Sequence, residues 1–214
     1  MSSFLTCRKG AVRSNPGRAT RPKGTFASGV VGDAGASVEI EPDNEVGGVM
    51  NIAYYHASKF GNGATVAEEF KKIMAARGVT VTVRHVRDAN PGNLQAADLY
   101  VFSSPGRMGK PRGNVRRFLR RVNLEPGTRY AILTTQGTPR PDRKTGKLPT
   151  QEEQDRWERV IPIMNELLEA KGMRKVAEGA VLVTGMKGPL EEGWQDKVTA
   201  FADQIMSVAG IQPR

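Results

Sequence analysis

From residue 50 onward the chain alternates short apolar runs with amphipathic segments. Continuous apolar runs predict buried strands at 51–55, 98–103, 130–134 and 179–184. The segment 79–86 instead alternates apolar and polar residues, which is typical of a half-exposed edge strand. Apolar residues at helical spacing predict helices at 64–77, around 112–122, at 151–171 and from Trp194 onward. Pro162 should kink the third helix or shift its start to about that residue.

Strands and helices in strict alternation indicate an α/β fold with a parallel sheet and helices on both faces. The edge-like second strand and the buried other strands favour a doubly wound five-stranded parallel sheet with the order 2-1-3-4-5. In such a sheet a ligand binds where the order reverses, at the carboxyl ends of strands 1 and 3. Residues 50–210 are therefore expected to form one domain.

Residues 1–49 lack periodicity and are rich in Gly, Ser, Pro and Ala, which predicts a disordered N-terminal extension. A second hypothesis places the native start at Met50, directly before the first strand. The residues Glu45 to Val49 require purine-rich codons that can contain a ribosome-binding site ahead of that methionine. Both interpretations leave the domain beginning at Met50.

The chain carries a formal charge of +10, of which the segment 1–49 contributes +1 and the remainder +9. The basic excess therefore belongs to the folded part and favours acidic partners or phosphorylated ligands. The single Cys7 excludes an internal disulfide and fits a cytoplasmic setting. No apolar run reaches the ~20 residues of a membrane span, and no Cys/His spacing indicates zinc.

The turn between the first strand and the first helix has the character of an anion site. Unpaired N–H groups and the helix dipole attract negative charge at a helix N-terminus. Ser58, Asn62 and Thr65 add polar donors, and Gly61 and Gly63 allow close approach of the backbone. The turn matches neither the P-loop nor the dinucleotide-binding fingerprint. An ordinary helix-capping turn remains the alternative to phosphate binding.

Three segments resemble the loops of the flavodoxin-like, FMN-binding family. They are Tyr55-x-x-Ser58-Lys59-x-Gly61-Asn62-Gly63, the run Ala97 to Pro105 followed by Gly109-Lys110-Pro111, and Leu133-Thr134-Thr135-Gln136-Gly137. The resemblance covers about residues 50–208 and implies FMN as cofactor. It implies phosphate contacts from Ser58, Lys59, Phe60, Gly61, Asn62, Gly63 and Thr65. It implies that the isoalloxazine is flanked by Ser104, Pro105, Gly106, Arg107, Met108, Gly109, Lys110, Thr135, Gln136 and Gly137.

The chain differs from that family pattern at three points. Gly63 stands where the family usually has threonine, and neither ring loop contains an aromatic residue, so that Met108 and Phe60 are the nearest substitutes. The family's long-established members are acidic, whereas this chain is basic. Arginine and lysine near the ring should stabilise the reduced, anionic flavin and make its potential less negative. The backbone of Gly106 or Gly109 is expected to supply a carbonyl that accepts the N5–H of reduced flavin.

Several other side chains have simpler structural interpretations. His56 is expected to be a partly exposed turn residue, and His85 to pack or lie at the sheet edge. Trp157 and Trp194 fall on the apolar faces of helices and are predicted to be core residues. The segment 138–150 is expected to be a polar loop, with a lid over the flavin as an alternative.

The basic face of the second helix is expected to be solvated or to dock an acidic redox partner. Its arginines are not interleaved with aromatic residues, so nucleic-acid binding is disfavoured. The sequence thus predicts an FMN-binding electron carrier. The alternatives are an FMN-dependent NAD(P)H/quinone-type reductase and a flavin-free module that binds phosphate or nucleic acid.

Overall fold

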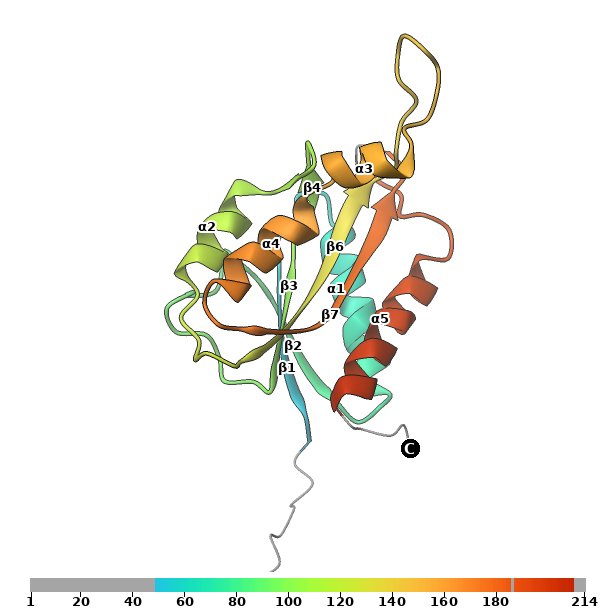
Figure 1. Cartoon of the computed structure of the whole chain (residues 1–214). Helices are drawn as coiled ribbons and strands as arrows, with labels where there is room; N and C mark the ends of the chain where they lie inside the picture. The colour runs from blue at the N-terminus through green and yellow to red at the C-terminus, as the bar shows by residue number, and fades with distance from the viewer. Residues whose placement is uncertain (1–48, 186, 210–214) are drawn as a thin grey trace, which may run out of the picture. The chain divides into compact units, whose positions relative to one another are not determined.

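The computed structural model describes residues 49–185 and 187–209 (Figure 1). Its strands are β1 (Asn51–His56), β2 (Thr80–His85), β3 (Leu99–Ser103), β4 (Gly106–Arg107), β5 (Lys110–Pro111), β6 (Arg129–Gly137) and β7 (Arg174–Val183). Its helices are α1 (Asn62–Ala75), α2 (Gly113–Arg121), α3 (Gln151–Trp157), α4 (Val160–Glu169) and α5 (Trp194–Ala209). The prediction for the N-terminal extension, including the Met50 start, concerns residues that lie almost entirely outside this range.

The main sheet is parallel and has the order β2-β1-β3-β6-β7. Because β4 and β5 form a separate antiparallel hairpin, this order is the predicted 2-1-3-4-5 arrangement of the five main strands. The edge position of β2 and the complete burial of β3 are also as expected. The order reverses between β1 and β3, so a crevice opens at their carboxyl ends.

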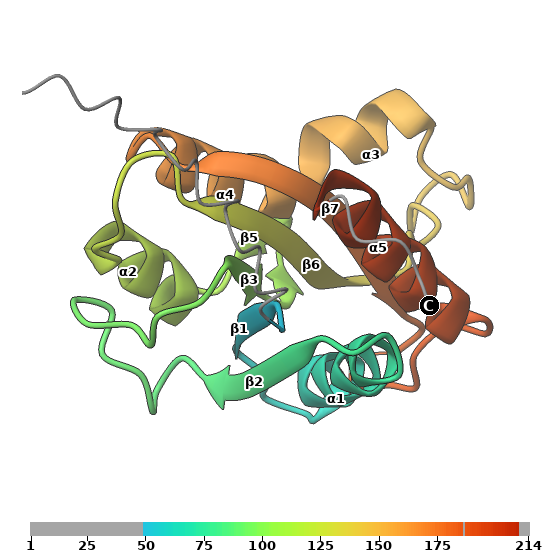
Figure 2. The same cartoon turned by 90° about the horizontal axis from the view of Figure 1, so that it is seen from below.

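Two pairs of helices cover the two faces of the sheet (Figures 1 and 2). Helices α1 and α5 pack on one face, and α2 and α4 pack on the other. Alternate strand residues point to opposite faces, so Ile52 and Tyr54 of β1 join the first core while Ala53 and Tyr55 join the second. Both cores are closed by apolar stripes of the helices, such as Phe70 of α1 and Leu119 of α2.

The third predicted helix is in fact two helices, and this break corrects the prediction for Trp157. Helix α3 ends at Trp157 and α4 begins at Val160, so Pro162 lies in the first turn of α4, where it is well tolerated. The break removes Trp157 from the apolar face that α4 presents to the core. Its side chain is 62% exposed, so its assignment to the core was wrong. Trp194, in contrast, is partly buried and packs against the first core.

His56 also differs from the expectation of a partly exposed turn residue. Strand β1 continues through His56, which pairs with His85 on one side and with Ser103 on the other. The residue is only 8% exposed. Pairing on both sides holds the strand extended by one residue beyond its apolar run. Within the described residues, no helix has the length and apolar character that crossing a membrane requires.

Candidate functional site

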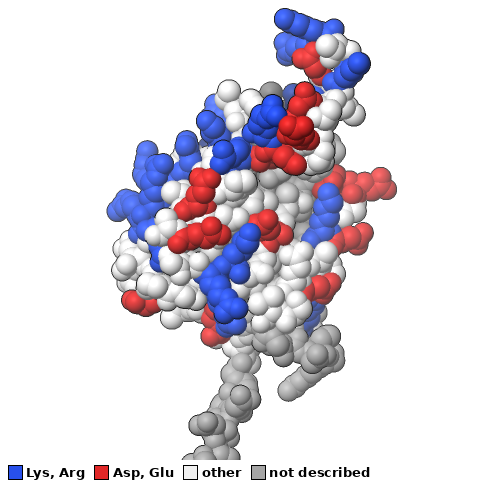
Figure 3. Space-filling model, viewed as in Figure 1, with Lys and Arg blue, Asp and Glu red and all other residues white. Residues whose placement is uncertain are grey.

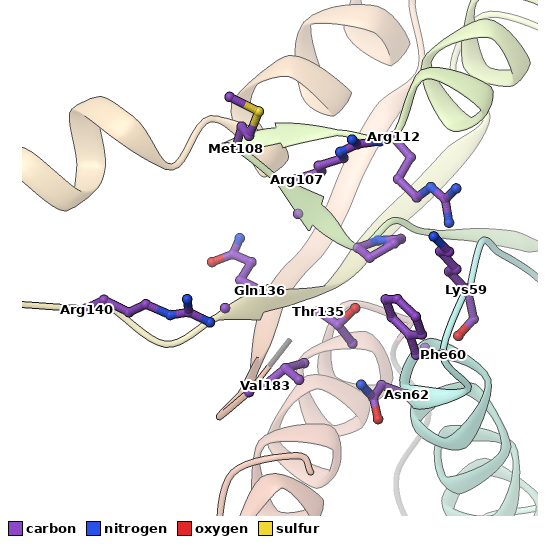
Figure 4. A pocket seen from close by; sticks show the side chains of 16 residues that line it. Lys59, Phe60, Asn62, Arg107, Met108, Arg112, Thr135, Gln136, Arg140 and Val183 are labelled. Carbon is purple, nitrogen blue, oxygen red and sulfur yellow. The ribbon is translucent and has the colours of Figure 1, made fainter. Parts of the chain in front are cut away.

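A cavity of about 610 Å³ opens at the carboxyl ends of the central strands. Figure 4 shows that its side chains come from the turn before α1 and the start of that helix, the β4–β5 hairpin, the start of α2, β6 with the loop after it, and β7. Its lining residues are Ser58, Lys59, Phe60, Asn62, Gly63, Pro105, Gly106, Arg107, Met108, Arg112, Thr135, Gln136, Gly137, Arg140, Val183 and Gly185. The cavity therefore occupies the crevice that the strand order creates.

The N-terminus of α1 forms one end of this cavity and has no side-chain cap. Gly61 is the N-cap residue, with φ of 92°, and its carbonyl accepts the N–H groups of Ala64 and Thr65 at 2.8 and 2.9 Å. The first turn contains no acidic side chain. The first N–H groups of the helix and its dipole are thus available to an anion at this end.

The β4–β5 hairpin forms another wall and turns through two residues with positive φ, Met108 at 52° and Gly109 at 68°. Positive φ at both central positions is the geometry of a type I′ turn. The carbonyl of Gly109 accepts the N–H of Arg159 at 2.7 Å, so it is already engaged. The cross-strand partner of Gly106 is Pro111, which has no N–H to donate. Of the two candidate carbonyls, that of Gly106 is the one left for a ligand.

Ser104 is fully buried and supports this wall from behind. Its hydroxyl donates to the carbonyl of Pro105 at 3.1 Å and accepts the N–H of Arg112 at 3.1 Å. Arg112 is the N-cap residue of α2, so Ser104 fixes the start of that helix against the hairpin. The serine shapes the cavity without lining it.

The charged side chains that line the cavity are all cationic. They are Lys59, Arg107, Arg112 and Arg140, and no aspartate or glutamate is among the lining residues. Lys59 comes from the turn before α1, Arg107 from the hairpin, and Arg140 from the loop after β6 (Figure 4). Four cations and an uncapped helix N-terminus together make a site for an anionic ligand.

Twelve of the seventeen residues predicted from the sequence line the cavity, and five do not. Thr65 is exposed and its hydroxyl donates back to the carbonyl of Gly61 at 3.4 Å. Gly61 has no side chain and contributes only its backbone to the start of α1. Ser104 is buried behind the hairpin wall, and Gly109 and Lys110 lie at the far side of the hairpin. Ligand contact by any of the seventeen stays a prediction.

The amide of Asn62 makes a structural contact that was not expected. Its nitrogen donates to the carbonyl of Lys187 at 3.1 Å and so joins the start of α1 to the loop after β7. Four lining residues, Arg112, Arg140, Val183 and Gly185, were missing from the predicted site. Val183 and Gly185 follow from the topology, because β7 ends at the same sheet edge as β6. Arg112 was counted as part of a solvated helix face.

The two histidines lie outside the cavity lining and form their own pair. The rings of His56 and His85 meet edge to face with centroids 5.2 Å apart. Burial and then the neighbouring His85 lower the pKa of His56, which favours its neutral form. The described residues contain no cluster of three or more His, Cys, Asp or Glu side chains suited to a metal ion.

The fold and the cavity define a doubly wound α/β protein with a cationic cavity at its topological switch point. Solved structures of flavodoxins share this architecture. A short-chain flavodoxin associated with a PDU bacterial microcompartment matches with a TM-score of 0.57 and 14% identity, over 75% of this chain and 99% of its own. Flavodoxin 2 from Bacillus cereus matches with a TM-score of 0.56 and 18% identity, over 73% of this chain and 98% of its own.

Larger proteins contain the same fold as one part. The flavodiiron core from Synechocystis sp. PCC6803 matches with a TM-score of 0.52 and 15% identity over 77% of this chain, which spans only 37% of that protein. No family model and no curated protein sequence matches the chain. At these identities the comparisons establish the fold, and the chain has the flavodoxin-like fold that its three loop motifs predict.

Proposed function

We propose that this protein binds FMN and transfers electrons through it. The observation that carries the proposal is the cationic cavity, free of acidic lining residues, at the uncapped N-terminus of α1. Its volume of about 610 Å³ lies within the range of small-molecule sites. A phosphate monoester would meet the helix N-terminus, and a planar ring would lie between the hairpin and β6. Solved flavodoxins have the same fold.

The residues have distinct roles in this arrangement. Ser58, Lys59 and the backbone from Gly61 to Gly63 would hold the phosphate. Pro105, Gly106, Thr135 and Gln136 would flank the ring, and the Gly106 carbonyl would accept a hydrogen bond from it. Bound FMN would supply one- or two-electron transfer, while the protein sets its orientation and electrostatic surroundings.

An acidic redox protein is the partner that best fits an electron carrier of this charge. The arginines of α2 gather on one side of the molecule, and among the described residues none of them forms an ion pair (Figure 3). They are Arg112, Arg116, Arg117, Arg120 and Arg121. Such a surface accelerates encounters with an acidic partner at low salt. The lone Cys7 fits a reducing, cytoplasmic setting for this exchange.

The second candidate function is an FMN-dependent reductase that takes electrons from NAD(P)H to a quinone-type acceptor. A further cavity of about 570 Å³ that adjoins the first one favours it, because a carrier has no need of a second small-molecule site. Anaerobic addition of NADPH separates the two. Direct bleaching of the bound flavin would identify a reductase, whereas bleaching that requires an added reductase protein would identify a carrier.

FMN binding is tested by titrating the purified protein with FMN and by replacing Ser58. The wild-type protein is expected to be yellow and to release FMN on heating. Ser58→Asp places a negative charge beside the phosphate and should weaken FMN binding at least about a hundredfold. Ser58→Asn, which has nearly the same shape without the charge, is the matched control and should lose about tenfold or less.

Two results would overturn parts of this proposal. Retention of full FMN affinity by Ser58→Asp would show that the phosphate lies elsewhere. A colourless wild-type protein that does not bind added FMN would remove both redox functions. A phosphate- or nucleic-acid-binding module would then be the remaining candidate.

A further inference from the structure

The second cavity lies directly against the first. It is bounded by the β4–β5 hairpin, by the segment that follows β6, and by α3. Gly106, Met108, Gln136, Gly137 and Arg140 line both cavities. A ligand in the second cavity would therefore lie beside a ligand in the first, at the side that carries Met108 and Arg140 (Figure 4).

Helix α3 provides one wall of the second cavity and contributes no buried residue to either core. It is held instead by local contacts. Thr150 and Glu153 form a capping box, and the amide of Gln154 donates to the carbonyl of Pro149 at 3.1 Å. At its other end the N–H of Arg159 donates to Gly109 of the hairpin at 2.7 Å. An element without a core role is thus fixed where Glu153, Gln154 and Trp157 face the cavity.

The apolar lining of this cavity suits a flat ring. Trp157 is 62% exposed and Met108 is 75% exposed, although both are large hydrophobic side chains. Pro139 and Leu182 add further apolar surface. Indole and thioether groups both make favourable contacts with aromatic rings.

The two cavities differ in their charged side chains. The first is lined by four cations, whereas Glu153, Glu158 and the shared Arg140 are the charged residues of the second. The Oε1 atom of Glu158 is buried and, in the part of the chain that is described, has no hydrogen-bond partner. Burial raises the pKa of Glu158, and the N–H of Val160 partly lowers it. The raised pKa lowers the cost of protonating Glu158 when a ligand binds, and a protonated carboxyl donates a hydrogen bond to a carbonyl oxygen.

We propose that the second cavity binds a planar, uncharged ring that carries a carbonyl group, with the ring against Trp157 and the carbonyl toward Glu158. The inference rests on the proposed function and extends it. The ring in the second cavity would exchange electrons with the FMN that we propose for the first cavity. A dihydronicotinamide with its carboxamide and a quinone share this chemistry. An anionic ring would be repelled by the carboxylate of Glu153.

Indole N–H resonances test the proposal on the FMN-loaded protein, in which Trp157→Phe assigns the signals of Trp157 and Trp194. The probes are nicotinamide and duroquinone, which are neutral, and nicotinate, which is an anionic match for nicotinamide. At least one neutral probe is expected to shift the Trp157 resonance saturably and leave that of Trp194 unchanged. Nicotinate is expected to bind at least about tenfold more weakly than nicotinamide.

Two variants distinguish the loss of a direct contact with the probe from a general change in the structure. Trp157→Ala should weaken the neutral probe about fivefold or more, measured by calorimetry. Arg156→Ala is the control, because Arg156 pairs with Glu152 at 2.7 Å on the outer side of α3 and does not line the cavity. Both variants should retain wild-type FMN affinity, which shows that the fold is intact.

The outcomes show whether the ring belongs to a nicotinamide or to a quinone. They also distinguish failure of this inference from failure of the proposed FMN function. Saturation by nicotinamide alone identifies a nicotinamide donor, saturation by duroquinone alone identifies a quinone, and saturation by both identifies the shared ring and carbonyl. The inference is overturned if neither neutral probe shifts Trp157, if nicotinate binds as tightly as nicotinamide, or if FMN displaces the probe from the apoprotein. A protein that binds a neutral probe and never binds FMN would refute the proposed function alone.

Discussion

Two glycines beside the first cavity have positive φ for different reasons. Gly61 has φ of 92° and an added Cβ would meet no atom within 4 Å, so only its backbone conformation requires glycine. Gly109 has φ of 68°, and an added Cβ would overlap the carbonyl oxygen of Trp157. The hairpin can approach the α3–α4 junction only because residue 109 has no side chain.

Gly109→Ala is therefore expected to destabilise the protein more than Gly61→Ala. The left-handed conformation alone should cost about 1 kcal/mol in Gly61→Ala. Overlap with backbone adds to that cost in Gly109→Ala, for a total of at least about 3 kcal/mol. Urea unfolding of both variants measures the difference. Equal losses of stability would show that the hairpin moves away from Trp157 at little cost.

Gly63 is a residue at which the chain can be brought closer to the family pattern. An added Cβ would meet the nearest neighbouring atoms, the Ala57 carbonyl and the Ser58 side chain, at 3.5 to 3.6 Å, which is ordinary contact. Gly63 lies in the first turn of α1 and lines the cavity. A threonine at this position can thus be accommodated and would present its hydroxyl to the proposed phosphate.

If FMN binds as proposed, Gly63→Thr should tighten FMN binding about tenfold, because a hydroxyl would donate to a charged oxygen. Gly63→Ala is the control for the methyl group and for helix propensity. It should stabilise α1 by up to about 1 kcal/mol without changing FMN affinity. Fluorescence titration with FMN compares the variants. Equal affinity of the threonine and alanine variants would contradict the phosphate position.

The burial of Trp157 and of His56 was predicted wrongly, and in both cases a contact distant in sequence is the reason. The spacing of Trp157 to Val160, Ile161 and Met164 fits one continuous apolar helix face, and only the break at Glu158 and Arg159 moves it off that face. The break depends on a tertiary contact, the bond from Arg159 to Gly109, which no local pattern reveals. His56 extends β1 because both neighbouring strands pair with it, which is also a long-range effect.

At the scale of elements, the junction between α3 and α4 places Glu158 next to the hairpin. An ideal Cβ at Gly106 would lie 3.4 Å from its Oε1 atom. Burial, opposed in part by the N–H of Val160, raises the pKa of this carboxyl above its ordinary value of 4.5. The native state therefore binds this proton more tightly than the unfolded state. The corresponding stability is present below pH 4.5 and is lost as the pH rises through the native pKa.

Glu158→Gln should accordingly raise the free energy of unfolding at pH 7 relative to the wild-type protein. Glutamine keeps an acceptor for the Val160 N–H and removes the partly buried charge. The advantage should disappear below about pH 4, where Glu158 is protonated in both states. Denaturant unfolding at several pH values measures this difference. A constant difference across the pH range would mean that the charge of Glu158 is not its cause.

One element was missing from the sequence prediction and another was predicted too short, for identifiable reasons. The β4–β5 hairpin has strands of two residues, and its turn is Met108-Gly109 rather than the usual Asn-Gly or Asp-Gly, so both its period and its turn signal are weak. Strand β7 begins at Arg174, five residues before its apolar run. Its first half includes Lys175 and Glu178, whose charges obscure a strand at the edge of the sheet.

At the scale of the whole domain, the strand order was predicted from one comparison. The segment that forms β2 alternates strictly between apolar and polar residues, whereas the other strand segments are continuous apolar runs. That contrast correctly identified the edge strand β2 and the buried strands β1, β3 and β6, but the prediction that the last strand is buried was wrong, because β7 is the other edge of the sheet and is only partly buried. The contrast also placed three loops at one end of the sheet, where the cavity is found. The second cavity was not predictable, because its wall is α3, whose position depends on the hairpin.

The basic charge of the domain also bears on the proposed flavin. A cation near the ring stabilises the reduced anion, so Arg107→Gln should lower the midpoint potential of its formation by about 20–40 mV. Arg117→Gln is the matched control, because Arg117 is on the exposed face of α2 and outside the cavity lining. Potentiometric titration of both variants gives the shifts. Equal shifts would mean that net charge, rather than position near the ring, sets the potential.

The absence of any buried residue in α3 has a kinetic consequence. Segments that bury little apolar surface open by local unfolding at a small fraction of the global free energy of unfolding. Helix α3 has this character, whereas the β6 wall of the same cavities is embedded in the sheet. The second cavity is thus bounded by one wall whose local opening costs little free energy and one that opens only with the whole domain. Entry and exit of a second ligand would proceed past α3 without disturbing the sheet that supports the first.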